Sequence, residues 1–402
     1  MNERIALIAD GRLILANTDG TSARHDCEFA ADIERREQRS ADKNSWLRGG
    51  DEGQMGMFSR SSLWGQRGSG GRASPRPRIV AVAGGDRPES MVYVLWTGVV
   101  GALLDFDFTE KYERRVFHRE RFHVSDFDRH AGDGRIACRF GDEELSNLAV
   151  LDPDGRNAKQ VTEGDSIDAS PSWVPGTEAI VYHSAGLSRD PEGRVLGLGP
   201  YSIHRIDLAS GELETVLESP AHDFLAPHAD ASGRLYFIRR TYEGPEGLKP
   251  SVWVTLKDSV LFPFRVIRAL VDFFQIFSQL VSRKPLTTAG GPKQQGPEPV
   301  RMWIHGRMID VQKASAANLP EGALAPADWV LVRRDADGTE TVLAKHVLAY
   351  DIAEDGRIAW SDGKNLHIIA ASSESGKKLL SEPLIDSVKW LEPFRAELKS
   401  ED

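Results

Sequence analysis

The sequence predicts an all-β fold of small repeated antiparallel sheets, and a recurring turn is the main reason for this prediction. Gly-Arg followed by apolar residues, entered through Asp or Ser, occurs at 10–14, 133–137, 232–236 and 355–359. Further Asp-Gly turns follow at 19–20, 154–155 and 337–338. A Gly-containing turn that leads into an apolar strand is typical of a β-hairpin. Recurrence of one such unit over a whole chain indicates a repeat architecture.

Strand alternation and turn residues divide the chain into six groups of expected strands. The second group comprises 78–82, 91–96, 102–106 and 115–118. The third comprises 124–127, a strand around 136, 148–151 and 159–161, and the fourth 170–173, 179–182, 202–206 and 214–217. The fifth comprises 224–226, 235–238, 329–332 and 341–343, and the sixth 347–350, a strand around 358, 366–369 and 378–380.

The first group is expected to form from both ends of the chain. Three N-terminal strands remain, together with one C-terminal strand at 385–390. Pairing the strand around Val388 with the strand around Leu7 would remove two exposed sheet edges. The sequence therefore predicts a single six-bladed β-propeller over 1–395, whose N- and C-terminal strands share one blade.

One stretch carries a resemblance to a known family. An Asp-Gly turn at 151–156, Gln-Val-Thr at 160–162, Ser-Pro-Ser-Trp-Val-Pro-Gly at 170–176 and an apolar strand at 179–182 follow one another. This order resembles the repeat of the TolB-like, WD-repeat-like six-bladed β-propeller family. The resemblance implies a six-bladed fold closed by both termini. TolB also carries an export signal and an N-terminal α/β domain, and neither is expected here, so the resemblance implies the fold and not the envelope role.

Composition excludes several classes of protein. The chain has 402 residues, 40% of them hydrophobic, and a formal net charge of −10. Such a charge argues against general nucleic-acid binding, because phosphate contacts need clustered Lys and Arg. The two cysteines, Cys27 and Cys138, provide no disulfide framework. The N-terminal residues have no charged segment followed by an apolar one, so we expect a cytoplasmic location.

A first insertion is expected at 30–77. A charged segment at 30–39 suits a helix, and a Gly/Ser/Arg-rich tract at 60–78 follows it. This composition predicts a flexible, solvated loop. The alternative is an arginine-glycine segment that contacts RNA or an acidic protein face, with Trp64 available for stacking.

A second insertion, at 257–300, is predicted to contain an amphipathic helix over 262–281 and a Pro/Gly-rich tether. Its polar residues step by three and four and form one narrow stripe. The expected partner-binding residues on the apolar remainder are Phe264, Ile267, Leu270, Val271, Phe274, Phe277 and Val281. The segment is short for a membrane span of about 20 residues. We expect it to dock on a partner protein or lie on the inner membrane surface; packing on the propeller's flank is the alternative.

Sequence motifs for catalysis are absent. There is no Gly-x-Ser-x-Gly, no His-Glu-x-x-His, no phosphate-binding loop and no Cys-x-x-Cys. Ligand-type residues gather only at the entrances of the third and fifth blades. These candidates for a ligand site in the central channel are Asp126, Asp128, His130, His222, Asp223, His228 and Asp230. The alternative is ordinary turn capping, since their spacing is not that of a metal site. No cofactor and no metal are predicted.

These observations predict a non-enzymatic cytoplasmic scaffold that binds one or more proteins. The alternative is a propeller enzyme, a metal-assisted hydrolase or lyase, with its site at the channel mouth. A convergent His/Asp cluster in the channel would favour the enzyme, and an apolar channel would exclude it.

Overall fold

The computed structural model is mostly β. It describes residues 4–36, 39, 76–87, 89–120, 122–141, 145–189, 195–244, 301–304, 307–310, 323–371 and 376–391.

The first half of the chain forms sheets from consecutive strands. One sheet has the order β27-β1-β2-β3, with β27 at Ile385–Trp390, β1 at Arg4–Ala9, β2 at Arg12–Asn17 and β3 at Ser22–Arg24. The next contains β4 (Arg78–Gly84), β5 (Ser90–Trp96), β6 (Val100–Asp107) and β7 (Tyr112–Glu120).

A nine-stranded sheet follows, and it consists of two parts. The first part contains β8 (Val124–Arg129), β9 (Ile136–Gly141), β10 (Ser146–Leu151) and β11 (Lys159–Gln160). The second contains β12 (Ser166–Trp173), β13 (Ala179–Arg189), β14 (Val195–Leu198), β15 (Ser202–Asp207) and β16 (Leu213–Leu217). A single parallel pair, Ser146 with Ile167, joins the two parts.

Two more four-stranded sheets complete the main body. One contains β17 (His222–Ala229), β18 (Leu235–Thr241), β21 (Val330–Arg334) and β22 (Glu340–Lys345), and the other β23 (Ala349–Ile352), β24 (Ile358–Ser361), β25 (Asn365–Ile369) and β26 (Lys377–Ser381). A separate hairpin is formed by β19 (Arg301–Ile304) and β20 (Arg307–Asp310).

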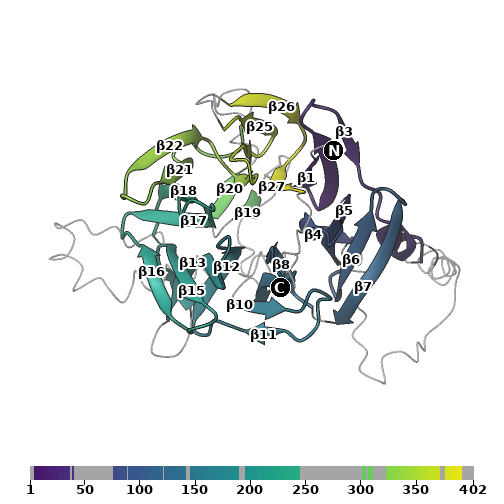
Figure 1. Ribbon diagram of the computed structural model, residues 1–402, viewed down its shortest axis with the longest axis horizontal. Helices are drawn as coiled ribbons and strands as arrows, with labels where there is room; N and C mark the ends of the chain where they lie inside the picture. The colour runs from purple at the N-terminus through teal and green to yellow at the C-terminus, as the bar shows by residue number, and fades with distance from the viewer. Residues whose placement is uncertain are drawn as a thin grey trace, which may run out of the picture.

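The sheets stand around a central axis, which is the arrangement of a β-propeller (Figure 1). Six inner strands, β4, β8, β12, β17, β23 and β27, contribute residues to the wall of a central cavity. The apolar core lies in layers between neighbouring sheets. Between β27-β1-β2-β3 and β4-β5-β6-β7, for example, Ile8 and Leu13 pack in one buried cluster with Tyr93 and Leu95. Each sheet is therefore buried on both faces.

The predicted pairing of the two ends of the chain is confirmed. β27 pairs with β1 in antiparallel register, and Leu7 lies opposite Val388. Both side chains are buried, in the layer that also contains Ala359 and Leu366 of the preceding sheet. Backbone groups of β1 that would otherwise lie at a buried sheet edge are thus hydrogen-bonded.

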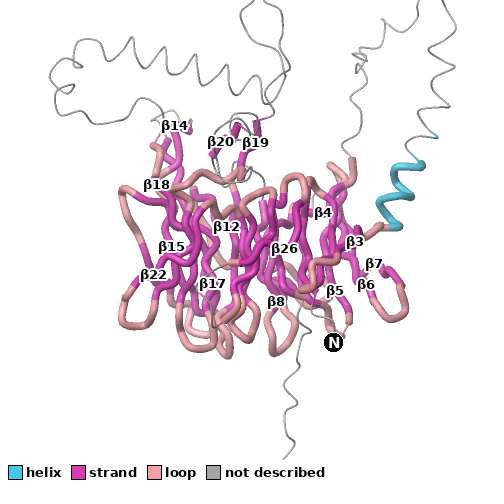
Figure 2. The backbone as a smooth tube through the Cα atoms, turned by 90° about the horizontal axis from the view of Figure 1, so that it is seen from above, coloured by secondary structure: helices cyan, strands magenta, loops and turns pink. Residues whose placement is uncertain are grey.

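The ring has two different faces. Neighbouring strands in each sheet are antiparallel. The second strand and the outer strand therefore both end on the side of the ring where the inner strand begins. Connections that leave these ends therefore share one face, which we call the insertion face. β14 and the β19–β20 hairpin project from it (Figure 2). The opposite face, the turn face, carries the short turns that follow the inner strands, such as 130–135, 174–178 and 230–234.

The helix expected at 30–39 is present over 28–36, and a buried cluster fixes its beginning. The Glu113 carboxylate on β7 accepts hydrogen bonds from the backbone N–H groups of Glu28 and Phe29, at 3.3 and 3.1 Å. The Tyr93 hydroxyl donates to the same carboxylate at 2.6 Å and lies 3.1 Å from His25 Nε2. A carboxylate at the first turn satisfies free N–H groups and suits the helix dipole.

Some expected elements cannot be compared with the structure, and others were missed. The Gly/Ser/Arg-rich tract and the helix at 262–281 lie outside the described residues. Within the described part, the sequence analysis did not predict β14 or the β19–β20 hairpin, which lengthen the excursions from the insertion face. No helix among the described residues has the length and apolarity to cross a bilayer.

Removing β27 should open the ring. A chain truncated after Glu382 is expected to lose its two-state melting and to become insoluble or protease-sensitive, because β1 would present an unpaired buried edge. Thermal melting and limited proteolysis measure this.

A chain truncated after Leu391 is the control, since it keeps β27 and should melt like the full chain. An unchanged melting temperature after the longer truncation would contradict a closed ring.

Candidate functional site

The centre of the ring contains a cavity of about 130 Å³ lined by all six inner strands. Most of these strands bulge where they meet the cavity. Register shifts occur next to Val80, Asp126, Ser170, Ala226 and Asp386. Asp126, Ser170 and Ala226 have positive φ values between 45° and 48°. A bulge changes the direction in which the side chains of a strand point, and here bulges recur on the inner strands around the central channel.

Five residues at one level of the channel form a closed ring of polar contacts, which we call the channel ring. Its members come from five different inner strands and are Asp128, Ser172, His228, Asp351 and Lys389. Lys389 Nζ lies 3.1 Å from Asp128 Oδ1 and 3.3 Å from Asp351 Oδ1. Ser172 Oγ lies 3.2 Å from His228 Nδ1 and 3.5 Å from Asp128 Oδ2. His228 Nδ1 lies 3.9 Å from Asp351 Oδ1, which closes the ring.

Both ring carboxylates also accept a hydrogen bond from the backbone of the neighbouring inner strand. Asp128 Oδ2 accepts the N–H of Trp173 at 2.9 Å, and Asp351 Oδ2 accepts the N–H of Trp390 at 2.7 Å. In both cases the donor follows a ring residue on the next inner strand. The carboxylates therefore connect adjacent sheets through both the side chains and the main chain.

The charges in the ring are fixed by their neighbours. Burial alone would lower the pKa of Lys389, but Asp128 and Asp351 act against it and raise that pKa above its usual value. Burial opposes ionisation of Asp128, yet Lys389 holds its pKa below the usual value. Burial lowers the pKa of His228, so the imidazole is neutral at pH 7. With two carboxylates and one ammonium, the ring has one net negative charge.

Ser172, His228 and Asp351 are the residue types of a hydrolytic triad, but their geometry differs from one. Both Ser172 and Asp351 approach the same nitrogen of His228, Nδ1. A relay needs the hydroxyl at one ring nitrogen and the carboxylate at the other. Ser172 is also buried. The arrangement suits structural cross-linking better than activation of a nucleophile.

Two further carboxylates line the cavity on the insertion-face side of the ring. Asp126 precedes Asp128 on β8, and Asp386 precedes Lys389 on β27. Oδ1 of Asp386 is buried and accepts no hydrogen bond from any described residue. Burial raises the pKa of Asp386 to about 7; Asp10 and Asp126 add to this effect, and Arg78 opposes it.

The structure brings three of the seven predicted ligand residues to the channel. Asp126 and His228 line the cavity, and Asp128 belongs to the channel ring. The other four do not line the cavity and lie elsewhere in the structure. Asp223 is buried against Arg240 at 2.7 Å, Asp230 caps its turn through the N–H groups of Ser232 and Arg234, and His222 is exposed at the start of β17.

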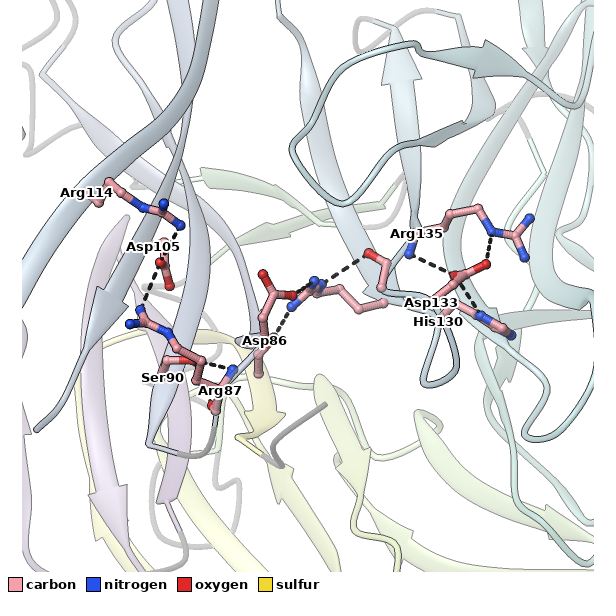
Figure 3. A network of polar contacts seen from close by, with 11 residues as sticks. Asp86, Arg87, Ser90, Asp105, Arg114, His130, Asp133 and Arg135 are labelled. Atoms are coloured by element: carbon pink, nitrogen blue, oxygen red, sulfur yellow. Dashed lines mark hydrogen bonds and ion pairs between the residues drawn. The ribbon is translucent and has the colours of Figure 1, made fainter. Parts of the chain in front are cut away.

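His130, the fourth, lies on the turn face with Asp133 and Glu178, close enough together to suggest a metal site. A guanidinium already occupies that place: Arg135 contacts Asp133 and Glu178, each at 2.5 Å. His130 Nδ1 lies 2.8 Å from Asp133, which sits between His130 and Arg135 (Figure 3). The two carboxylates are thus compensated by Arg135.

The sequence analysis missed Asp351, Lys389 and Asp386. A signal for two of them exists: Ser172-Trp173 and Lys389-Trp390 are equivalent pairs at the ends of inner strands, and Asp351 stands in the same place on β23. Asp386 has no such signal, because its role depends on a bulge that shifts the register by one residue.

Fold and site together define a β-propeller with a charged, polar channel. No known protein-family model matches the sequence, and no curated protein matches it. Among solved structures the chain is similar to TolB from Acinetobacter baumannii, with 11% identity and a TM-score of 0.48 over 97% of this chain and 66% of that one, slightly less than two thirds. It is also similar to the tricorn protease (13%, 0.47, 96% and 34%) and to a chain of a nidogen/laminin complex (6%, 0.49, 97% and 98%).

Replacing Lys389 with Met should leave Asp128 and Asp351 buried without their cation. Breaking a buried ion pair by removing one partner costs about 3–5 kcal/mol. We expect a loss of unfolding free energy of this order, measured by urea denaturation at pH 7.

Lys345→Met, at an exposed lysine on β22, is the matched control and should change little. Equal stability of both variants would show that the ring does not hold the sheets together.

Replacing Asp386 with Asn should stabilise the chain at alkaline pH. A carboxyl whose folded pKa is raised contributes stability below its unfolded pKa, near 4, and loses it as the pH rises to about 7. In EDTA-containing buffer at pH 8 we expect Asp386→Asn to exceed the wild type by about 2–4 kcal/mol, with the difference shrinking toward pH 5.

Asp154→Asn, in an exposed turn, provides the comparison and should follow the wild-type pH profile. An Asp386→Asn profile parallel to the wild type would mean that Asp386 is ionised normally.

Proposed function

We propose that the chain is a six-bladed β-propeller that acts as a non-enzymatic, protein-binding scaffold. Support for six blades comes from the four four-stranded sheets of the ring together with the two parts of the nine-stranded sheet. The joint between those parts is only one residue pair long. Each of the six units contributes one strand to the cavity wall.

The observation that carries the scaffold proposal is the gathering of all long excursions on the insertion face. The connection from β3 to β4, the connection from β18 to β21, and the β14 excursion all leave from strand ends on that side. The turn face has only short turns within the described residues. Loops held by a rigid framework are where binding surfaces usually lie.

The first of these excursions is anchored at its start. Glu113 caps the helix at 28–36, and this cluster is buried between two sheets. The chain therefore leaves the ring in a fixed direction before the Gly/Ser/Arg-rich tract begins. Such anchoring reduces the entropy cost of presenting a binding segment.

The proposed main contact is the apolar face expected over 262–281. Burial of a large apolar side chain contributes about 1.5–3 kcal/mol, so a few of its phenylalanines and leucines are enough for a stable contact. A partner protein is the proposed occupant, and the inner membrane surface is the competing one. The cytoplasmic location expected from the sequence belongs to this proposal.

The enzyme alternative gains a convergent His/Asp cluster but lacks a working geometry. Every ionised group of the channel ring is already paired, and His228 offers one nitrogen to both neighbours. The cavity of about 130 Å³ is also smaller than the ~300–1,000 Å³ of typical ligand pockets. A metal-assisted hydrolase or lyase is therefore not proposed.

The double variant Leu270→Asp/Phe274→Asp should abolish partner binding without changing the fold. The control is Gln279→Asp, on the polar stripe. Both variants are compared by affinity purification with quantitative mass spectrometry and by flotation with phosphatidylethanolamine/phosphatidylglycerol vesicles. Loss of the same proteins only in the double variant supports a protein partner, and loss of flotation only in the double variant supports the membrane.

Excision of 261–299 with a short Gly/Ser bridge tests the alternative that this segment belongs to the propeller. We expect a folded, soluble chain with an unchanged melting temperature. An unfolded product would place the segment in the propeller core and overturn the docking proposal.

A further inference from the structure

Two half-buried carboxylates in the channel accept no hydrogen bond from another described residue, and one of their oxygens is fully buried. Asp126 and Asp386 both line the cavity, and each is the extra residue of an inner-strand bulge, on β8 and β27. No described residue donates a hydrogen bond to buried Oδ1 of Asp386. Buried charges in proteins are paired or bind a metal ion, and an unsatisfied buried polar atom calls for an explanation.

The cations near these carboxylates are already paired with other carboxylates. Lys389 also lines the cavity, but its ammonium is held by Asp128 and Asp351 at 3.1 and 3.3 Å. The channel ring itself keeps one net negative charge, because burial leaves His228 neutral. Asp386, whose pKa is raised to about 7, adds a negative charge above that pH, and the Asp126 carboxyl lies in the same cavity wall. Arg78 also acts on Asp386, but it is paired with Asp10 at 3.4 Å. The cavity wall therefore carries more negative charge than these paired cations balance.

The donor types define the class of cation. The residues of the cavity wall include three aspartates and the hydroxyl-bearing residues Ser170, Ser172 and Ser387, and they include no cysteine. The one histidine in the wall, His228, uses its Nδ1 within the ring. Oxygen donors in an irregular arrangement suit Ca²⁺, which accepts six to eight oxygens with variable geometry, whereas Mg²⁺ demands an octahedral shell. A volume of about 130 Å³ leaves room for an ion and several of its waters.

We propose that the central channel binds one hard divalent cation of the calcium type between Asp126 and Asp386, on the insertion-face side of the channel ring. Water molecules complete its coordination shell. The ion compensates the two carboxylates and connects the inner strands β8 and β27. This site is separate from the apolar docking segment of the proposed function, so either can fail without the other.

Calcium binding is tested on the full chain with Ca²⁺ alone as the probe. After EDTA treatment, we expect CaCl₂ at pH 8 to cause a saturable rise in melting temperature of the order of a few degrees. Equilibrium dialysis with ⁴⁵Ca should give about one bound ion per chain.

Asp386→Asn and Asp126→Asn are expected to lose both the thermal shift and the bound ⁴⁵Ca. Asp154→Asn, at an exposed turn, should keep both. Because Asp386→Asn is expected to be at least as stable as the wild type, its loss of binding would not reflect unfolding.

Three results would overturn the proposal. They are the absence of a shift in the wild type up to millimolar CaCl₂, an equal shift in NaCl at matched ionic strength, and retention of ⁴⁵Ca by Asp386→Asn. An equal affinity for Mg²⁺ would overturn the assignment to the calcium type.

Discussion

Pairing of β27 with β1 is the constraint on which the rest of the molecule depends. This single strand closes the ring of sheets, buries Val388 in the layer between two sheets, and carries the cation of the channel ring. Lys389 then holds carboxylates from two other sheets, and Trp390 donates its N–H to one of them. Closure of the sheet and placement of a cation in the channel are thus achieved by three consecutive residues.

The two faces and the channel have different roles in the molecule. Short Asp-Gly turns and their ion pairs make the turn face compact, as at Asp133 with Arg135. Because neighbouring strands are antiparallel, the strand ends from which the long connections leave lie on the insertion face. The anchored helix at 28–36 is the first part of one of these connections. Between the two faces, the polar contacts of the channel connect the inner strands, so its charged residues serve mainly to hold the fold together.

Repeated turns were sufficient to predict most of the fold, because each of these Gly turns joins two antiparallel neighbouring strands, as Gly134 joins β8 to β9 and Gly338 joins β21 to β22. The late outer strands β21 and β22 were predicted for the same reason. The candidate site was predicted only in part. Asp128 and His228 were found through their blade entrances, but Asp223 and Asp230 follow the same spacing and face structural partners. Asp386 could not be found, since one bulged residue decides which way its side chain points.

Closure by β27 has a consequence for synthesis of the chain on the ribosome. β1 precedes the other described strands in the chain and its partner β27 follows them, so β1, β2 and β3 must wait as an incomplete sheet while the sheets between them are made. During this time Leu7 and Ile5 remain uncovered on the side that β27 later fills. Exposed strand edges of this kind promote misassembly. Propeller assembly in the cell therefore depends on how long the nascent first sheet is shielded, and slow translation of the intervening insertions would prolong that period.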